Sequence, residues 1–430
     1  MLRRVHVAPV PIEAYREIAP TAQIEELLAL AQMLRGVRIA HINATSYGGG
    51  VSELLRSAIA LQRGLGLSVD WLVISGDERF FEVTKSLHNG LQGASFVASV
   101  EYEEIYEVNN RANAATLPCD YDVIVVHDPQ PAALRAFAHD TSSRWIWRCH
   151  IDTSEPDPAA ESFLRRWLDA YDAYVFTMPE FVLPALRDRA VVTFPPGIDP
   201  LSPKNLPLAA TLRRRIIGWH GVDPERPLLV QVSRYDSWKD PLGVIRIFRR
   251  VREHVAGLQL ALIGSMALDD PEGWRLYDWV RKEAEHDNDI LVGTNLTGIS
   301  FVEVNAFQHC AWVVIQKSIR EGFGLVVSEA LWKETPVVAG RSGGITLQME
   351  DGEGGFLVPP HDEDAFVECV VRLLSDRELA RTLGQRGRQR VRERFLITRY
   401  LVDELRLVAG ILQAVSAARE RVDEQHGRDA

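Results

Sequence analysis

The stretch VRIAHINATSYGGGVSELLRSAIALQR, residues 37–63, decides the fold class. Its first seven residues are predominantly apolar, with Val37, Ile39, Ala40 and Ile42, as in a strand buried on both faces of a parallel sheet. Three glycines follow at positions 48–50, and an amphipathic helical pattern then continues to Arg63. A strand, a glycine turn and a helix in this order predict the first unit of a βαβ series.

The same alternation recurs along the chain. Apolar runs that predict strands lie at 37–43, 69–75, 121–127, 144–150 and 173–178, and again at 227–234, 258–264, 289–293, 311–316, 335–340 and 355–359. The proline-rich stretch FPPGIDPLSPKNLP, residues 194–207, separates the two series, because proline sustains neither a helix interior nor a central strand. We predict an α/β protein with two Rossmann-like, doubly wound domains that face an interdomain crevice. The expected domains are 1–205, completed by a C-terminal helix at about 395–430, and 206–394.

Composition excludes several classes of protein. The 430 residues are 46% hydrophobic and 25% charged, as in an ordinary globular protein, and the formal charge of -11 argues against a nucleic-acid partner. No apolar run approaches the roughly 18 residues of a membrane span, and the N-terminus lacks the apolar core of a secretory signal. The four cysteines form no CxxC pair. We therefore expect a cytoplasmic protein that does not contact membranes.

Lysine is scarce compared with arginine. A compositional bias of the genome explains this scarcity, but it also makes the position of each lysine worth checking. The six lysines are Lys85, Lys204, Lys239, Lys282, Lys317 and Lys333.

Two cations follow the first apolar run of the second series. The segment SRYDSWKDP, residues 233–241, contains Arg234 and Lys239, and Asp240 with Pro241 is a typical start of a helix. Ligands of open α/β sheets bind at the carboxyl ends of the strands. Arg234 and Lys239 could therefore neutralise a diphosphate. Two solvated loop cations are the alternative.

A glycine-rich turn with two glutamates lies further on. In EGFGLVVSEAL, residues 321–331, Glu321 stands in a turn and Glu329 in the helix that follows. Gly322 and Gly324 let the backbone approach a ligand closely, and the helix start offers free N–H groups. The arrangement suits sugar hydroxyls and phosphate oxygens. Glycines that only shape a turn, with an acidic residue near a helix start, are the alternative.

Polar residues also end the strands of the first series. They occur in HDPQP, residues 127–131, and in RCHIDTS, residues 148–154, and they favour a polyol ligand. His150 is also consistent with a hydrogen-bonded core histidine. No third ligand at zinc-like spacing accompanies these clusters, so we expect no metal site. The glycines at 48–50 do not form GxGxxG, and a plain βα turn explains them equally well.

Together these motifs resemble the retaining glycosyltransferases of family 4, which have the GT-B fold. The order and spacing of the motifs match across nearly the whole chain. More narrowly, HDPQP, RCHIDTS, FPPGIDPLSPKN and QVSRYDSWKDP are similar to the trehalose glycosyltransferring synthases. Those enzymes join a nucleoside-diphosphate-glucose to free glucose and make α,α-trehalose. The resemblance implies that the first domain binds the acceptor and the second binds the nucleotide sugar.

The resemblance also implies roles for residues of the second domain. Glu329 would bind the ribose hydroxyls, and Arg234 and Lys239 would clamp the diphosphate. Glu321 would hold the donor glucose together with the backbone amides of Gly322, Phe323, Gly324 and Leu325. The base would contact the chain around 293–296, which includes Asn295.

Further roles fall on the first domain. The resemblance places His150 beside the transferred sugar, near its C6 hydroxyl, and Gly49 and Gly50 near the phosphates and the acceptor. Strand-end position alone suggests acceptor contacts for three residues. These are Asp128, Gln130 and Asp152.

The resemblance implies transfer with retention, no tightly bound cofactor and no metal. The expected partners are small molecules, namely nucleoside-diphosphate-glucose (UDP, ADP or GDP), glucose and trehalose, and a homodimer is possible. A trehalose phosphorylase, a glucosyltransferase with another sugar acceptor, and a non-catalytic sugar or nucleotide sensor are the alternatives.

Overall fold

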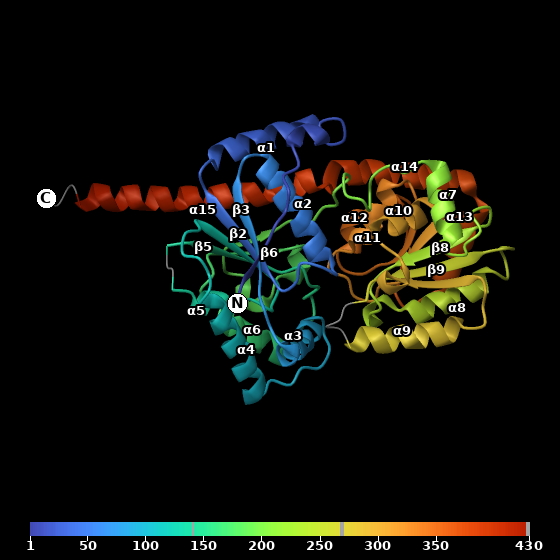
Figure 1. Cartoon of the computed structure of the whole chain (residues 1–430), viewed down its shortest axis with the longest axis horizontal. Coiled ribbons are helices and arrows are strands. Elements are labelled where there is room, and N and C mark those ends of the chain that lie inside the picture. The colour runs from blue at the N-terminus through green and yellow to red at the C-terminus, as the bar shows by residue number, and fades with distance from the viewer. Residues whose placement is uncertain (140–141, 267–270, 427–430) are drawn as a thin grey trace. The chain divides into compact units, whose positions relative to one another are not determined.

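The computed structural model describes residues 1–139, 142–266 and 271–426. Its contacts divide the chain into two compact units. The N-terminal unit comprises Met1–Pro195 together with the C-terminal segment that begins at Ile397, and the central unit comprises Pro196–Leu396. In Figure 1 the N-terminal unit runs from blue to green, with the red C-terminal helix added, and the central unit runs from green to orange-red.

The N-terminal unit has a seven-stranded sheet in the order β1-β3-β2-β4-β5-β6-β7. All neighbouring strands are parallel except the edge pair β1 and β3. The strands are β1 Arg3–Val5, β2 Arg38–Asn43, β3 Ser68–Val73, β4 Val123–His127, β5 Arg144–Arg148, β6 Ala173–Phe176 and β7 Val191–Thr193. The helices are α1 Thr21–Met33, α2 Gly50–Gly64, α3 Glu78–Leu91, α4 Val100–Ala114, α5 Leu134–Phe137, α6 Pro158–Leu168 and α15 Ile397–His426. Short 3-10 turns occupy Ile12–Tyr15, Pro179–Phe181 and Pro184–Leu186.

Helices cover both faces of this sheet (Figure 1). On one face α15 packs along α1 and also contacts α2, while α3, α4 and α6 pack against one another on the other. The core on the second face is unusually rich in large aromatic side chains, and its largest fully buried members include Trp145, Trp147, Tyr106 and Phe80. Burial of both faces explains why the central strands are almost continuously apolar.

The central unit has a six-stranded parallel sheet in the order β10-β9-β8-β11-β12-β13. Its strands are β8 Leu228–Val232, β9 Gln259–Gly264, β10 Ile290–Thr294, β11 Val313–Gln316, β12 Val337–Gly340 and β13 Gly355–Val358. Its helices are α7 Ala210–Trp219, α8 Pro241–Val251, α9 Pro271–Ala284, α10 Phe301–Cys310, α11 Leu325–Trp332, α12 Ile345–Gln348, α13 Glu363–Ser375 and α14 Arg377–Arg394. Turns of 3-10 type lie at Ser237–Lys239 and Asn295–Thr297. Helices α8, α9 and α13 share a core with one face of the sheet.

These sheets confirm the predicted fold class, and each apolar run that predicts a strand overlaps one. The three-residue edge strands β1 and β7 escaped prediction for different reasons. β1 (RRV) carries two charged residues, whereas β7 (VVT) is apolar but is only three residues long and directly precedes the proline-rich stretch.

The boundary between the units differs from the expected one. We predicted that the first domain extends to residue 205, but residues 196–205 belong to the central unit. Asn205 accepts a hydrogen bond from Lys333 Nζ (2.7 Å), and the backbone N–H of Ile198 donates to the carbonyl of Phe395 (2.8 Å). The proline-rich stretch is therefore bonded to the unit that follows it, and the return to the first unit comes at Ile397.

Each sheet has one point at which the strand order reverses. In the N-terminal unit the chain winds outward from β2 in one direction and from β4 in the other, and in the central unit it does so from β8 and from β11. Loops that leave the carboxyl ends of such a strand pair diverge and leave room for a ligand.

Candidate active site

The loop that leaves β8 is held in one conformation by its own side chains. Asp236 accepts a hydrogen bond from a backbone N–H of the 3-10 turn (2.9 Å), and Gln231 donates to the carbonyl of Lys239 (2.8 Å). Asp240 has a left-handed backbone (φ 41°) and caps α8 by accepting from the N–H of Gly243 (2.9 Å). The sequence predicted this cap, and the loop fixes the backbone that carries Lys239.

The loop that leaves β11 is bonded to the first loop. Lys239 Nζ lies 2.6 Å from Glu321 Oε2, and Ser318 Oγ donates to the same carboxylate oxygen (3.0 Å). The backbone N–H of Ile319 donates to the carbonyl of Trp238 (2.7 Å). The two loops at the switch point thus form one structure, and it brings together two residues that the sequence singled out separately.

Helix α11 begins directly after Glu321 and the glycines. Gly324 has a left-handed backbone (φ 80°), and no side chain caps the helix. Gly344 packs so closely that a Cβ there would lie 2.4 Å from the carbonyl oxygen of Gly322, and its N–H donates to the carbonyl of Glu321 (3.1 Å). The backbone of residues 322–325 is therefore held from behind. An uncapped helix start of this kind favours an anionic or hydroxyl-bearing ligand.

Glu329 is deeply buried within α11 and already has partners. Its Oε1 lies 3.3 Å from Lys204 Nζ, and its Oε2 accepts a 3.4 Å hydrogen bond from Gln308. Lys333, one turn further along the helix, donates to the Glu329 carbonyl (3.0 Å) and to Asn205 (2.7 Å). Burial lowers the pKa of Lys333 to about 7.

Four of the six lysines lie in this part of the central unit. Lys204, Lys239 and Lys333 are described above. The fourth is Lys317, whose Nζ forms an ion pair with Asp240 and whose side chain is almost completely buried. Sequence reasoning did not assign roles to Lys204, Lys317 or Lys333. The signal that could have found them is the scarcity of lysine, since each of these three is buried beside a candidate site residue.

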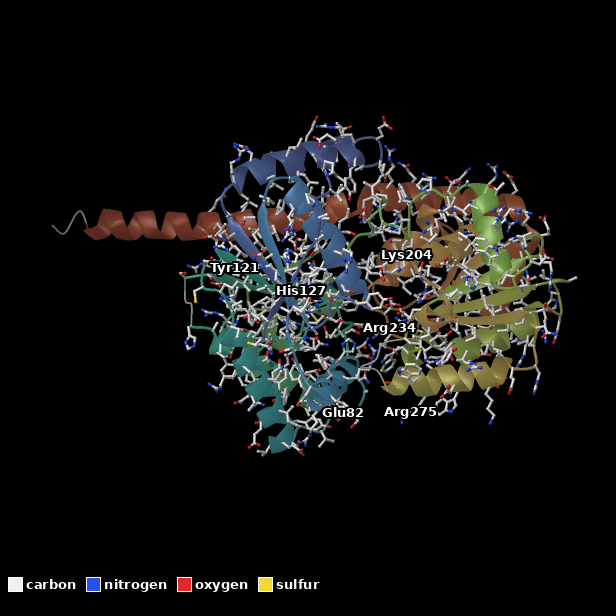
Figure 2. The ribbon with its side chains drawn as sticks, in the orientation of Figure 1. Glu82, Tyr121, His127, Lys204, Arg234 and Arg275 are labelled. Atoms are coloured by element: carbon white, nitrogen blue, oxygen red, sulfur yellow. The ribbon has the colours of Figure 1, made fainter. Side chains whose placement is uncertain are left out.

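Arg234 and Asn295 differ from the residues above. Arg234 is partly exposed, and its Nη2 lies 3.3 Å from Asp236 Oδ2 (Arg234 and Lys204 are labelled in Figure 2). The Asn295 side chain accepts from the N–H of Met266 (2.7 Å) and donates to its carbonyl (3.3 Å). Both the oxygen and the nitrogen of this amide are bonded to the loop backbone. A nucleotide base bound here would therefore contact the backbone rather than the Asn295 side chain.

In the N-terminal unit, α2 starts at the switch point next to β2. Gly48 has a left-handed backbone (φ 83°), whereas Gly49 is extended and a Cβ there would meet open space. Gly50 is exposed and opens α2, which no side chain caps. Gly49 and Gly50 are thus not required by the turn itself, and they leave the start of α2 unobstructed.

The polar residues after β4 and β5 contact one another. Asp128 has an unusual left-handed backbone (φ 65°), and its carboxylate accepts a hydrogen bond from the N–H of His150 (2.8 Å). Burial raises the pKa of Asp128 to about 7. Asp152 accepts from the hydroxyl of Ser154 (2.6 Å) and is buried in its own turn, while the carbonyl of Gln130 accepts from Asn110 (3.2 Å).

Three histidines on adjacent strands form a chain that ends at this cluster. His41 Nδ1 and His127 Nε2 are 3.1 Å apart, and His127 Nδ1 and His150 Nε2 are 3.0 Å apart. His41 and His127 are buried within the N-terminal unit, where His127 is labelled in Figure 2, and His150 is partly exposed. Burial lowers the pKa of all three rings. Of the three histidines, the sequence assigned a role only to His150: His127 was part of the strand-end motif HDPQP without a role of its own, and His41 stands inside an apolar strand run.

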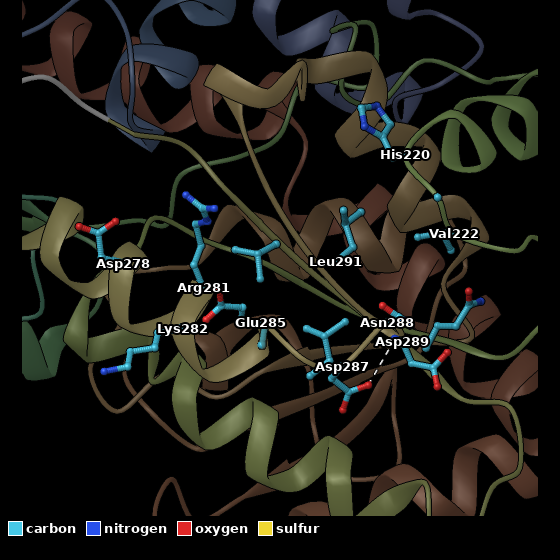
Figure 3. A pocket seen from close by; sticks show the side chains of 15 residues that line it. His220, Val222, Asp278, Arg281, Lys282, Glu285, Asp287, Asn288, Asp289 and Leu291 are labelled. Carbon is cyan, nitrogen blue, oxygen red and sulfur yellow. Dashed lines mark hydrogen bonds between the residues drawn. The ribbon is translucent and has the colours of Figure 1, made fainter.

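A polar hollow of about 610 Å³ opens elsewhere in the central unit (Figure 3). It lies where β9 and β10 begin, at the edge opposite the carboxyl ends of these strands. Arg281, Lys282 and Glu285 line it, and its Asp287 and Asp289 pair with arginines of the same unit. None of the predicted site residues lines this hollow. Its acidic and basic side chains are mixed, so it does not favour an anionic ligand.

The described residues contain neither a metal-ligating cluster nor a membrane-spanning helix. Within 1–139, 142–266 and 271–426, no group of three or more potential metal-ligating side chains is arranged to hold an ion. In the same part of the chain, no helix combines the length and the apolar character needed to cross a bilayer.

Comparisons with known proteins bear on both units. Residues 41–183 match the family model described as "Trehalose synthase, N-terminal domain", and residues 213–390 match "Glycosyl transferases group 1". The chain is 50% identical over 417 residues to the trehalose synthase of Rubrobacter xylanophilus, which covers 96% of this chain and all of that protein. The chain belongs to the trehalose synthase family of glycosyltransferases.

Two more distant similarities concern the fold and the alternative activity of a phosphorylase. The solved structure of the trehalose-6-phosphate synthase OtsA superimposes with a TM-score of 0.69 at 13% identity, covering 86% of this chain and 99% of that one. This likeness shows the GT-B fold. The trehalose phosphorylase of Pleurotus pulmonarius is 27% identical over 88% of this chain, but the match covers only 58% of that protein. Members of this family are glycosyltransferases that act on small sugar substrates.

Proposed function

We propose that this protein transfers glucose from a nucleoside-diphosphate-glucose to free glucose, with retention of configuration, and so makes α,α-trehalose. The observation that carries this proposal is the joined pair of loops at the β8–β11 switch point. Lys239, Glu321 and the uncapped start of α11 stand together there, and Arg234 follows β8 in the same loop as Lys239.

The charges of this site support a diphosphate leaving group. Cleavage of the sugar–phosphate bond leaves negative charge on the diphosphate, so a fixed cation nearby stabilises the transition state more than the substrate. Lys239 is held for this task by Gln231 and by Glu321. Arg234 is the second cation, and its partial exposure leaves it able to reach a ligand. We propose that no metal is needed, because these two cations would supply the charge.

The remaining donor contacts follow from the same placement. Glu321 is proposed to bind hydroxyls of the donor glucose with one carboxylate oxygen while Lys239 holds the other, and residues 322–325 offer backbone N–H groups. Glu329 is proposed to bind the ribose. Because Lys204 occupies its carboxylate in this structure, ribose binding would require that ion pair to loosen or to be shared.

The acceptor side is proposed for the N-terminal unit. Asp128, at the end of β4, is proposed to contact the acceptor, and it accepts a hydrogen bond from the backbone N–H of His150. The His150 ring is proposed to contact the transferred sugar beside it, and the start of α2 is open at Gly49 and Gly50. These groups include both hydrogen-bond donors and acceptors and few exposed charges, which suits the hydroxyl groups of a sugar.

A product assay tests the proposal. The pure protein is incubated with UDP-, ADP- or GDP-glucose and free glucose, and the products are followed by NMR. We expect a non-reducing α,α-linked disaccharide together with the nucleoside diphosphate. Glucose 1-phosphate released from trehalose and phosphate would instead establish a phosphorylase, and tight nucleotide binding without any turnover would establish a sensor.

A further inference from the structure

The histidine chain of the N-terminal unit continues beyond His41 to two further buried groups. Tyr400 Oη donates to Glu404 Oε1 (2.8 Å), and Gln62 Nε2 donates to Glu404 Oε2 (2.8 Å). Gln62 comes from α2 and Glu404 from α15, and both side chains are buried. Glu404 and Gln62 thus stand next to His41, the inner end of the row of rings that runs through His127 to His150.

The direction of the hydrogen bonds in this chain follows from its far end. A carboxylate only accepts hydrogen bonds, so Glu404 turns the NH₂ group of Gln62 toward itself. The carbonyl oxygen of Gln62 then points the other way. Gln62 Oε1 and His41 Nε2 are both buried without a hydrogen-bond partner among the described residues, and the two side chains are close enough to interact. A bond from His41 Nε2–H to Gln62 Oε1 satisfies both atoms.

Each neutral imidazole carries one proton, so this first bond fixes the others. With its proton on Nε2, His41 must accept at Nδ1 from His127 Nε2–H. His127 must then accept at Nδ1 from His150 Nε2–H. The chain leaves His150 with a bare Nδ1, which is an acceptor for a hydroxyl proton.

The surroundings keep the three rings neutral. Burial lowers the pKa of His41, His127 and His150. The positive charge of Arg148 lowers the pKa of His127 and of His150 further, whereas the negative charge of Glu404 acts in the opposite direction on His41. Asp128, which accepts from the His150 backbone, is the other ionisable group against this end of the chain.

We propose that His41 and His127 are positioning residues that hold His150 in the tautomer with a bare Nδ1, so that it accepts a hydrogen bond from a hydroxyl group of the bound sugar. The sugar contact rests on the proposed function, but the tautomer does not. A residue that fixes the tautomer of a functional histidine changes its activity without touching the substrate.

Nitrogen-15 NMR of histidine-labelled protein tests the tautomer directly. The His150 signals are assigned by their loss in His150→Gln. We expect His150 protonated at Nε2 in the wild type, and a mixture of tautomers in His41→Leu. A His150 proton on Nδ1 in the wild type would overturn the proposal whatever the activity.

Kinetics with donor sugars that lack single hydroxyl groups test the consequence. For the wild type, removal of the hydroxyl that His150 contacts should lower kcat/KM by about 10- to 100-fold. In His127→Leu we expect the normal donor to react about 10- to 100-fold more slowly and that discrimination to shrink to a few-fold. His41→Asn keeps an acceptor toward His127 and should recover part of the loss seen in His41→Leu.

A matched control separates positioning from stability. Asn113 is equally buried in the same unit and bonds the backbone of Ser75, outside the chain. Asn113→Leu should keep the full discrimination between donors. An unchanged discrimination in His127→Leu would contradict the proposal, and absence of transfer by the wild type with every donor would contradict the proposed function, while the NMR result would still decide the tautomer.

Discussion

The two units place polar side chains at the same edge of similar sheets but fill that edge with opposite chemistry. In the central unit the switch point carries ion pairs, namely Lys239 with Glu321 and Lys317 with Asp240. In the N-terminal unit the corresponding edge carries neutral rings, since burial lowers the pKa of His127 and His150. The first arrangement suits a charged diphosphate and the second suits uncharged hydroxyls, as the proposed donor and acceptor roles of the two units require.

The largest expected effect concerns the buried ion pair of the central unit. Lys204→Met leaves the Glu329 carboxylate buried without its cation, and breaking such a pair costs about 3–5 kcal/mol. We expect a loss of this size in the free energy of unfolding, measured by urea denaturation. The double variant Lys204→Met/Glu329→Leu removes both charges and should be more stable than Lys204→Met. A double variant less stable than the single one would show that the pair is not what holds this region.

The next effect concerns Lys239, the cation that we propose stabilises the leaving group. Lys239→Ala should lower kcat by about 10²–10³-fold, because it removes a fixed charge from the leaving group. Arg234→Ala should act in the same direction. Lys282→Ala is the matched control, since Lys282 is an exposed lysine of the same unit that lines the hollow at the opposite edge of the sheet. Circular dichroism checks that each variant is folded, and near-normal turnover in folded Lys239→Ala would refute the role of this residue.

Acid should destabilise the N-terminal unit through its histidines. Their pKa values are lowered in the folded chain, so below about pH 6.5 the unfolded chain binds protons that the native rings do not, and stability falls as pH falls. Each histidine contributes up to about 1.4 kcal/mol per pH unit. The pKa of Asp128 is raised to about 7, so its carboxyl group stabilises the folded chain as pH falls from 7 toward its ordinary pKa. This single group opposes three histidines, so the histidines decide the direction.

Urea unfolding at pH 7.5 and at pH 5.5 measures this effect. We expect a lower free energy of unfolding at pH 5.5, and a smaller difference in His127→Leu, which has one titrating ring fewer. Equal or greater stability at pH 5.5 would show that the rings are not held neutral.

The smallest effect concerns Asn295. Its amide bonds the backbone of Met266 at both ends, so Asn295→Ala should cost about 1–2 kcal/mol of stability. The preference among UDP-, ADP- and GDP-glucose should remain within about twofold of the wild type, because no side-chain contact with the base is lost. A large change in nucleotide preference would show that the Asn295 side chain does contact the base.

The sequence predicted the fold well because the buried strands are long apolar runs, and periodicity reports burial directly. It did not predict the edge strands β1 and β7, because each has only three residues and periodicity cannot be read over so short a segment. The division of contacts falls at Pro195 rather than at the predicted residue 205. Contacts such as the bond between Asn205 and Lys333 join positions far apart in the chain, and no local pattern reports them.

The candidate site was predictable where a local motif carries it and not where partners come from distant segments. Asp240 was read as a helix cap from its neighbours alone, and the structure confirms that cap. The partnership of Lys204 with Glu329 depends on the packing of residues 196–205, which no local pattern reports. His41 lies inside an apolar run and His127 in the strand-end motif HDPQP, and neither pattern reports a partner. Only the side-by-side placement of β2, β4 and β5 shows that they form a chain with His150.

Transfer of glucose from the nucleotide to free glucose is tested most directly with one labelled carbon atom. The protein is mixed with nucleoside-diphosphate-glucose carrying ¹³C at C1 of its glucose, together with unlabelled free glucose, and the reaction is followed by NMR. We predict that the label appears in one half of α,α-trehalose, in the α configuration, as the nucleoside diphosphate is released. Label that accumulates only in free glucose or in glucose 1-phosphate would contradict the claim.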